Sequence, residues 1–325
     1  MRKFIVSDLH GDINTYNAIM GYLENISKSD EVILYINGDL IDRGIYSADM
    51  LIDIKNRIEN ENPFKIEYLA GNHELMMWQA YPVYKNGTRW DLHMNTNWGS
   101  NGGSITAACL EDELTIDEED QMFHFIKKLK LYHKFEETIN DKKIVLAHAA
   151  CPKNPLDICD LTIEDVANDI TNVVDLTWSH KEHLITPSMQ EKYDLLWKSK
   201  LNRMTRQMDF NIKLGNDDFF TIIGHTPVEN SLGYEFYESD NVLNIDGGEA
   251  LYWRGYFEFD HSPLVEIDSN NNRFIILTFN HNNEIIYGTY LDSKITYMNN
   301  SELENHRKFL DKNTKIYKLD KDLFS

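Results

Sequence analysis

Residues 3–12 read Lys3-Phe4-Ile5-Val6-Ser7-Asp8-Leu9-His10-Gly11-Asp12, a short apolar run that ends in a polar loop. The same order of residue types occurs twice more, where residues 32–36 lead into Asn37-Gly38-Asp39 and residues 66–70 lead into Gly71-Asn72-His73-Glu74. The apolar runs are rich in β-branched and aromatic residues, which is typical of short strands buried on both faces. These three segments decide the fold that we predict.

Helical patterns over residues 13–25 and 47–59 lie between the three runs. The order strand, helix, strand, helix, strand predicts an α/β fold whose parallel strands are joined by right-handed crossovers. Open sheets of this kind bind ligands outside the carboxyl ends of their strands. We therefore expect the Asp, His and Asn side chains of the three loops to converge at that edge.

The composition is that of a folded domain. The chain has 325 residues, of which 42% are hydrophobic and 12% aromatic, and it shows no low-complexity stretch or repeat. The formal net charge is −21, and broad binding to nucleic acid requires Lys and Arg to neutralise phosphates. We therefore expect no extended nucleic acid among the partners, and the composition does not indicate an oligomeric state.

The sequence favours a cytoplasmic protein without a membrane partner. The apolar run after Met1 is too short for the hydrophobic region of a signal peptide, and no apolar stretch approaches the ~18 residues that a membrane span needs. The cysteines, which are few and lack metal-binding spacing, suit a reducing compartment. They are Cys109, Cys151 and Cys159.

The middle of the chain continues the pattern of strands that end in polar residues. A short helical pattern covers residues 75–79, and the Asn-, Gly- and Trp-rich residues 86–104 predict an ordered loop beside the site. A helical pattern over residues 117–130 precedes two strand-like runs, residues 131–136 and 143–147. The second run leads directly into His148-Ala149-Ala150.

The second half predicts a cap and a β-rich tail. The more polar residues 152–214, with helical patterns near 162–169 and 189–200, predict a cap insertion. Strand-like residues 219–223 lead into Gly224-His225, and residues 241–245 lead into Asp246-Gly247-Gly248. We expect residues 1–250 to form the main domain and residues 251–325 a β-rich extension packed on it, with His148 and His225 in the far half of the sheet.

The residue types at these strand ends suit phosphate ester hydrolysis. Two divalent cations ~3.5 to 4 Å apart can activate water and neutralise phosphoryl oxygens, and such a pair needs about half a dozen ligands, one of them a carboxylate able to bridge. Six residues form a set of that kind: Asp8, His10, Asp39, Asn72, His148 and His225. Asp8 and His10 would face one ion if the extended conformation persists to His10.

Each of these residues alone has a plainer explanation. An isolated Asp-x-His is usually a pair of polar side chains at the protein surface, and an aspartate after a strand is usually a cap. A lone histidine that ends an apolar run, like His148 or His225, is more often hydrogen-bonded structure than a ligand. The joint pattern is what favours a metal centre.

Several blocks resemble the signature of the phosphoprotein phosphatase branch of the calcineurin-like metallophosphoesterases, and specifically bacterial-type serine/threonine protein phosphatases. They are Asp8-Leu9-His10-Gly11, Gly38-Asp39-Leu40-Ile41-Asp42-Arg43-Gly44, Gly71-Asn72-His73-Glu74, His148 and Gly224-His225. The resemblance covers residues 3–250, with gaps at 80–140 and 152–214. It implies a four-layered β-sandwich flanked by helices, with two metal ions above the strand ends.

The resemblance also implies roles for single residues. Asp8 and His10 would hold the first ion, and Asp39 would bridge. Asn72, His148 and His225 would hold the second ion. The cofactors would be two divalent ions, with Mn²⁺ favoured and Fe, Zn, Ni or Mg as alternatives.

Three further residues would act on the substrate by the same resemblance. His73 would donate a proton to the leaving oxygen, and Asp42 would orient it. Arg43 would bind phosphoryl oxygens, for which its planar guanidinium is suited, with a structural salt bridge to Asp42 as the plainer alternative.

The cap departs from the bacterial pattern. Relatives often carry Trp-x-Arg there, which supplies a second phosphate-binding arginine, whereas Trp197 is followed by Lys198 and Ser199. Ser199 takes the place of the arginine, and its substitute would be Lys198, Lys200 or Arg203. A lysine would bind phosphate as a point charge, without the fork of a guanidinium.

The leading hypothesis is a phosphatase that acts on phosphoserine or phosphothreonine in proteins, or on a small phosphorylated compound. A hydroxide held between the two metals would attack phosphorus in line with the leaving oxygen. The nearest alternative is a symmetrical dinucleoside polyphosphate hydrolase, and a small phosphodiesterase is another. Polyphosphate hydrolases typically lack the aspartate before the arginine, whereas Asp42 is present here. A non-enzymatic binding protein would have lost at least one ligand, and each expected ligand type is present.

Overall fold

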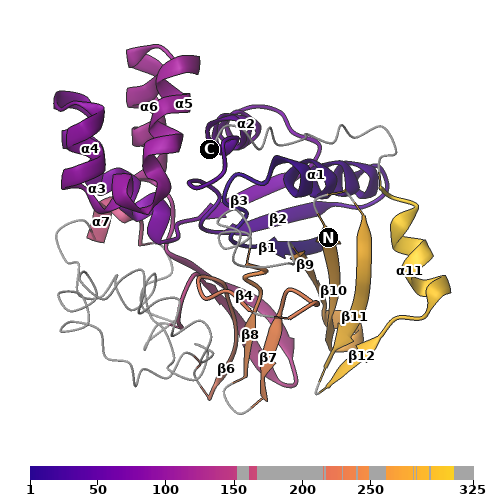
Figure 1. Ribbon diagram of the computed structural model, residues 1–325. Coiled ribbons are helices and arrows are strands. Elements are labelled where there is room, and N and C mark those ends of the chain that lie inside the picture. The colour runs from indigo at the N-terminus through magenta and orange to yellow at the C-terminus, as the bar shows by residue number, and fades with distance from the viewer. Residues whose placement is uncertain are drawn as a thin grey trace.

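The computed structural model describes residues 1–151, 161–166, 215, 217–228, 230–238, 241–248, 261–280, 282, 284–292 and 294–310 (Figure 1). Most of the predicted cap, with Lys198, Ser199, Lys200 and Arg203, lies outside these ranges, as does Cys159. Within them, no helix is long and apolar enough to cross a membrane.

A seven-stranded sheet combines early and late strands of the chain. Its strands in chain order are β1 (Arg2–Val6), β2 (Val32–Asn37), β3 (Lys65–Leu69), β9 (His261–Asp268), β10 (Arg273–Asn280), β11 (Ile285–Leu291) and β12 (Ile295–Tyr297). Their order across the sheet is β12-β11-β10-β9-β1-β2-β3, with β1, β2 and β3 parallel as predicted. The late strands continue this sheet because β9 pairs antiparallel with β1. The predicted division at residue 250 stays a prediction.

A five-stranded sheet carries the second half of the site. It consists of β4 (Tyr132–Ile139), β5 (Lys142–Ala147), β6 (Phe219–Ile223), β7 (Glu235–Tyr237) and β8 (Val242–Asn244), in the order β4-β5-β6-β8-β7. Strands β5, β6 and β8 are parallel. His148 follows β5 and His225 follows β6, so the expectation that they lie in the far half of the first sheet is wrong. A histidine at the end of an apolar run indicates that the run is a strand, but it does not indicate which sheet that strand joins.

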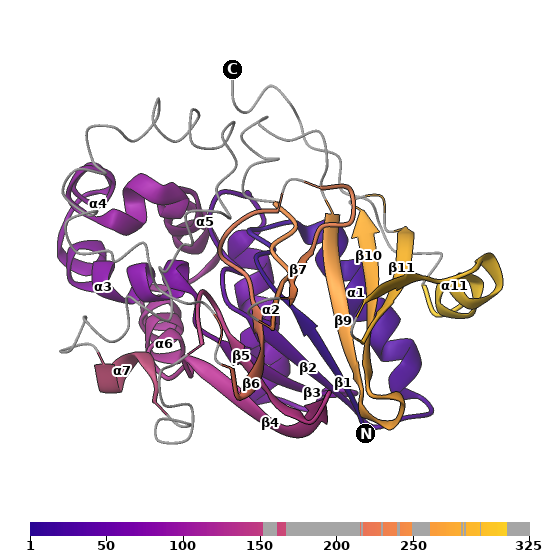
Figure 2. The same cartoon turned by 90° about the horizontal axis from the view of Figure 1, so that it is seen from below.

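The two sheets pack face to face as a β-sandwich (Figures 1 and 2). One apolar cluster between them joins Ile5 and Tyr35 of the seven-stranded sheet to Ile144, Leu146 and Phe220 of the five-stranded sheet. Alternate residues of β1 and β2 point the other way, into a cluster under the helices. Because these strands are buried on both faces, their sequences are apolar throughout rather than alternating.

Helices α1 (Ile13–Ser27) and α2 (Ser47–Glu59) cover the outer face of the seven-stranded sheet (Figure 1). On the outer face of the other sheet, the apolar clusters around Val145 and Ile223 contain no residue from a described helix. The mixed α/β sandwich is thus confirmed, while the second helical layer stays a prediction. The remaining short elements are α7 (Ile163–Val166), η4 (Ser269–Asn271) and α11 (Asn300–Arg307).

A group of helices gathers beside the carboxyl ends of β1–β3. It comprises α3 (Asn72–Asn86), α4 (Arg89–Asn95), the π-turn η1 (Gly99–Gly103), α5 (Ser104–Glu113) and α6 (Ile116–Ile126). The prediction that residues 86–104 form a loop is therefore wrong, since most of them are helical. Helix α3 also runs through Pro82. The ring costs a backbone hydrogen bond, but Tyr81 and Tyr84 pack on Phe123 on either side of it.

Candidate metal centre and catalytic site

The six predicted metal ligands come together at the strand ends of both sheets. Asp8 and His10 follow β1, and Asp39 follows β2. Asn72 begins α3 directly after β3. The sandwich brings these loops of the first sheet against the loops after β5 and β6 of the second, which carry His148 and His225. Five of the six are buried, and His225 is partly exposed.

The loop after β1 is not extended, although Asp8 and His10 were expected to face one ion only if the extended conformation persisted to His10. Asp8 and His10 have φ values of 55° and 42°, and the strand ends at Val6. Backbone bonds from Asp8 N to Gly38 O (3.2 Å) and His10 N to Asp39 O (3.0 Å) hold this conformation. A left-handed residue costs ~1–2 kcal/mol and persists where surrounding bonds impose it. The two side chains therefore diverge: His10 lies beside Asp39, and the Asp8 carboxylate accepts hydrogen bonds from His225 N at 3.1 Å.

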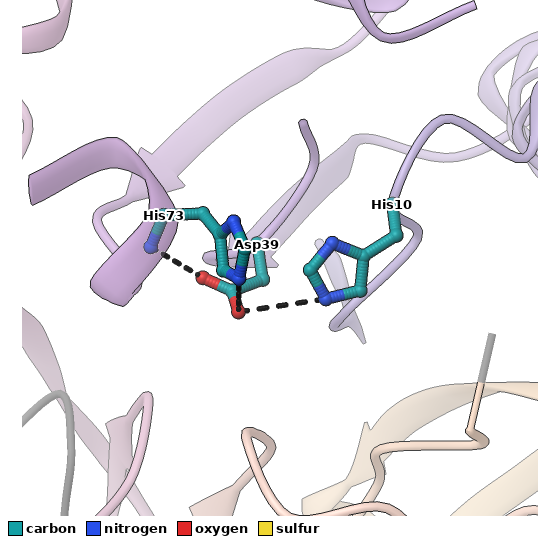
Figure 3. Close-up of side chains that lie close together, drawn as sticks. All are labelled: His10, Asp39 and His73. Carbon is teal, nitrogen blue, oxygen red and sulfur yellow. Dashed lines mark hydrogen bonds and ion pairs between the residues drawn. The ribbon is translucent and has the colours of Figure 1, made fainter. Parts of the chain in front are cut away.

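Asp39 lies between two groups of donor atoms. Its Oδ2 is 3.5 Å from His10 Nε2 and 3.8 Å from His73 Nε2 (Figure 3). Its Oδ1 is 3.4 Å from His148 Nε2 and also accepts from His73 N at 3.0 Å. One carboxylate thus presents a separate oxygen to each group, as a bridging ligand must.

The second group is built around the amide oxygen of Asn72. Asn72 Oδ1 lies 3.0 Å from His148 Nε2 and 2.8 Å from His225 Nδ1. Ligand atoms of Asp39, His148 and His225 all lie within 4.8 Å of one another. With Asn72, this is a compact set of oxygen and imidazole donors that follow four different strands.

Backbone carbonyls fix the orientation of two of the histidines. His10 Nδ1 donates to Ile41 O at 2.8 Å, and His148 Nδ1 donates to Asn37 O at 2.8 Å. In each ring the Nε2 atom therefore faces Asp39, where it could bind an ion once any proton it carries or donor it accepts from is displaced. Histidines that bind metals are typically held by such a bond from the other ring nitrogen.

The buried carboxylates of the site favour positive charge close to them. Burial lowers the pKa of His148, but the carboxylates of Asp39 and Asp8 outweigh it and raise the pKa to about 10. Burial raises the pKa of Asp39, but His148, His73 and His10 outweigh it and hold that pKa well below its usual range. Burial and the nearby Asp246 raise the pKa of Asp8. A divalent cation that displaced these protons would satisfy the same charge.

The residues present fit two divalent cations. Among the described residues, two groups can hold an ion, one of His10, Asp39 and His73 and one of Asp39, His148 and His225, and they share Asp39. Mixed carboxylate, amide and imidazole donors suit Mn, Fe or Zn ions better than a purely oxygen site would. Asp8 is in neither group, and His73 is in the first, although the resemblance assigns it to proton transfer.

His73 and Asp42 form a buried pair. His73 Nδ1 lies 2.6 Å from Asp42 Oδ2, and both side chains are fully buried. Since a carboxylate only accepts, Nδ1 carries the hydrogen and Nε2 is the atom that faces the site. Asp42 therefore holds the ring of His73 in one orientation.

Arg43 lies over the ion group of His10, Asp39 and His73 rather than on Asp42. Its Nη1 and Nη2 donate to His10 Nε2 (2.5 Å) and His73 Nε2 (2.8 Å). Arg43 and Asp42, which are both described, do not form the salt bridge that was the alternative role of Arg43. The Asp42 carboxylate pairs with His73 instead. Asp42 and Arg43 have φ values of 73° and 71°, and this backbone directs the two side chains apart.

The site also depends on Glu74, which lies in the first turn of α3. Its buried carboxylate accepts from the backbone N–H groups of Asp39 (2.9 Å), Leu40 (3.1 Å) and Gly71 (2.8 Å) and from Tyr68 OH (2.6 Å). It thereby ties the loop that carries Asp39 to the start of α3. The block Gly71-Asn72-His73-Glu74 by itself did not indicate this link.

Replacing Glu74 by Gln is expected to lower the free energy of unfolding by ~2–4 kcal/mol, because the amide nitrogen would face backbone N–H groups and leave them unsatisfied. Urea denaturation of the variant measures this. Glu118→Gln is the matched control, since Glu118 accepts its hydrogen bonds at an exposed helix start. Equal unfolding free energies for the two variants would contradict the account.

Other residues near the site were not identified from the sequence. Asp246 is buried, and burial raises its pKa to about 7, with a hydrogen bond from Gly248 N and the charge of Arg43 opposing. The one available signal was its position directly after a strand-like run. Trp98 and Thr106 both donate to Asp42 Oδ1, and nothing in their spacing indicated it.

Two ion-binding groups that share one aspartate lie at the strand ends of a β-sandwich. This arrangement is that of a metal-dependent hydrolase. The model of the calcineurin-like phosphoesterase family matches residues 1–259. The chain belongs to this family.

Comparison with solved structures returns distant similarities in fold. A cold-active protein-tyrosine phosphatase of a psychrophilic Shewanella species is 17% identical, with 92% of this chain and 80% of that chain covered and a TM-score of 0.37. A putative diadenosine tetraphosphatase is 14% identical (85% and 93% covered, TM-score 0.44). A protein serine/threonine phosphatase from Saccharomyces cerevisiae is 13% identical (86% and 80%, TM-score 0.46). A search of curated proteins finds no match.

Proposed function

We propose that this protein is a phosphomonoesterase that hydrolyses phosphoserine or phosphothreonine in proteins. The observation that carries the proposal is the buried His73–Asp42 pair, 2.6 Å apart, beside Arg43 and the ion-binding groups. A serine or threonine alkoxide is a poor leaving group and needs a proton as the ester bond breaks. A nucleotide leaves as a far weaker base, so a hydrolase for polyphosphates needs such a proton donor less.

Different residues of the chain would bind the metal ions and the phosphoryl group. Two divalent ions would be held here, with Mn²⁺ as the proposed metal. Asp39 would hold one ion together with His10 and Asp8, and the other together with Asn72, His148 and His225. When bound, the ions supply Lewis-acid activation of water and neutralise charge. Arg43 would turn from the two histidines to the phosphoryl oxygens, with its planar donors matching two of them. That movement frees His73 Nε2.

Proton transfer then falls to His73. Its Nε2 would carry a proton that passes to the ester oxygen as the bond from that oxygen to phosphorus breaks, and the product alcohol leaves neutral. Asp42 Oδ2 would stabilise the charged ring while Nε2 is protonated. The attacking water enters from the side opposite the leaving oxygen, and its oxygen becomes part of inorganic phosphate.

A side-by-side rate comparison tests the proposal. With Mn²⁺ present, we expect kcat/KM on a phosphoserine or phosphothreonine peptide to exceed that on diadenosine tetraphosphate by at least about tenfold, which is ~1.4 kcal/mol of transition-state binding. Inorganic phosphate and nucleotide release measure the two reactions. A reversed ratio would favour the dinucleoside polyphosphate hydrolase, and activity confined to small diesters would favour the phosphodiesterase.

A further inference from the structure

The carboxylate of Asp42 is held from two sides. Oδ2 accepts from His73 Nδ1 at 2.6 Å, while Oδ1 accepts from Trp98 Nε1 at 2.9 Å and from Thr106 Oγ1 at 2.6 Å. Thr106 Oγ1 in turn accepts from Asp42 N at 3.1 Å. All four side chains are fully buried.

Two neutral donors on one oxygen determine which way the carboxylate faces. A buried ionised carboxylate is costly unless hydrogen bonds satisfy its lone pairs. Because Trp98 and Thr106 occupy Oδ1, rotation about the side chain would break two bonds at once. Oδ2 is therefore held toward His73, and with it the orientation of the imidazole.

The turn that follows Trp98 makes this arrangement possible. Gly103 lies against the indole, and a methyl group at this position would overlap the Trp98 ring. Gly102 has a φ of 107°, and a Cβ there would lie 2.9 Å from Arg43 Cγ. The same short turn therefore sets the indole N–H on Asp42 and covers the side of Arg43. Its Asn-Gly-Gly sequence permits both approaches.

We propose that Trp98 and Thr106 are positioning residues for proton donation, which act by holding Asp42 Oδ2 on His73 Nδ1. The inference rests on the proposed hydrolysis of phosphomonoesters. Its distinctive consequence is a dependence on the leaving group. Loss of a positioned proton donor slows the release of an alkoxide strongly and the release of p-nitrophenolate weakly, whereas general damage to the site slows both.

The test compares Trp98→Phe and Thr106→Val with the wild type, all loaded with Mn²⁺. We expect kcat on a phosphoserine peptide to fall about 10- to 100-fold, the range seen when outer partners of functional groups are removed. KM should stay within about twofold, and kcat on p-nitrophenyl phosphate should fall less than about threefold. Thr106→Ser keeps the hydroxyl donor and should restore peptide turnover.

Trp78→Phe is the matched control. Trp78 lies half-buried on α3, with its ring stacked on that of Tyr81 at a centroid distance of 5.6 Å. The side-chain donors to Asp42 among the described residues are His73, Trp98 and Thr106. Its replacement should leave the ratio of the two rates unchanged. An equal loss on both substrates in Trp98→Phe, or no loss on either, would overturn the proposal.

A spectroscopic measurement separates this proposal from the proposed function. In Mg²⁺-loaded protein with ¹⁵N-labelled histidine, the His73 Nδ1 proton should give a strongly downfield resonance that Trp78→Phe and Thr106→Ser retain. In Trp98→Phe and Thr106→Val it should shift or broaden. An unchanged resonance would overturn the positioning role even if phosphopeptides are hydrolysed. A changed resonance would support that role even if the proposed substrate is wrong.

Discussion

Replacing Asp39 by Asn is expected to lower the turnover of an aryl phosphate by about a thousandfold, because a loss of ~4 kcal/mol of transition-state stabilisation corresponds to that factor. Asp39 is the one residue shared by both ion groups, with Oδ2 toward His10 and Oδ1 toward His148. An amide cannot present two anionic oxygens. The variant should therefore also bind fewer metal ions per chain, as measured by mass spectrometry of the elements.

The control for this change is Asp141→Asn. Asp141 is exposed in the turn between β4 and β5 and has a φ of 62°, so it shares the left-handed backbone of Asp39 without its contacts. It should keep wild-type turnover and metal content. If Asp39→Asn kept both as well, the bridging role would be refuted.

His73→Asn is expected to reduce turnover of a phosphoserine peptide by about 10²- to 10⁴-fold, the usual contribution of a positioned proton donor. Metal content should stay near that of the wild type, because Asp39, His10, Asn72 and the late histidines remain. The loss on p-nitrophenyl phosphate should be much smaller. Steady-state kinetics on both substrates and metal analysis measure these quantities together.

Metal content decides between the two roles open to His73. Its Nε2 lies 3.8 Å from Asp39 Oδ2, close enough for the ring to belong to the first ion group. Loss of one ion per chain in His73→Asn would make it a ligand and refute proton donation. His124→Asn, at an exposed position of α6, controls for the substitution itself.

The local elements of the first sheet could be predicted from the sequence because each has a strong pattern of its own. The run Lys3-Phe4-Ile5-Val6 and its two successors became β1, β2 and β3, and the predicted helix 47–59 has the observed bounds. Residues 86–104 were harder to assign. Their Gly and Asn content indicated a loop, but burial of Trp98 against Phe123 and Tyr84 stabilises short helical turns there.

The convergence of the site was predictable only in part. Strand-ending polar residues identified the candidates, since buried strands with polar termini predict where side chains gather. The left-handed backbone of Asp8 and His10 was not predictable from spacing, because it depends on bonds to the loop after β2. Assignment of β5 and β6 to a second sheet likewise depends on pairing between distant segments, which single-strand patterns do not encode.

Hydrogen bonds across long sequence separations explain the remaining gaps. Trp98 and Thr106 reach Asp42 from more than 50 positions away, and Glu74 reaches the backbone of Asp39 and Leu40. Each of these side chains has an ordinary role when it is considered alone. Only the folded chain shows that they support the residues of the site.

Removal of metal tests the central claim most directly. The protein is treated with chelator until elemental analysis shows less than about 0.1 metal ion per chain, and hydrolysis of p-nitrophenyl phosphate is then followed during titration with Mn²⁺. The two ion groups around Asp39 predict that activity is lost and returns as about two ions bind per chain. Full activity in the verified metal-free protein would contradict the account.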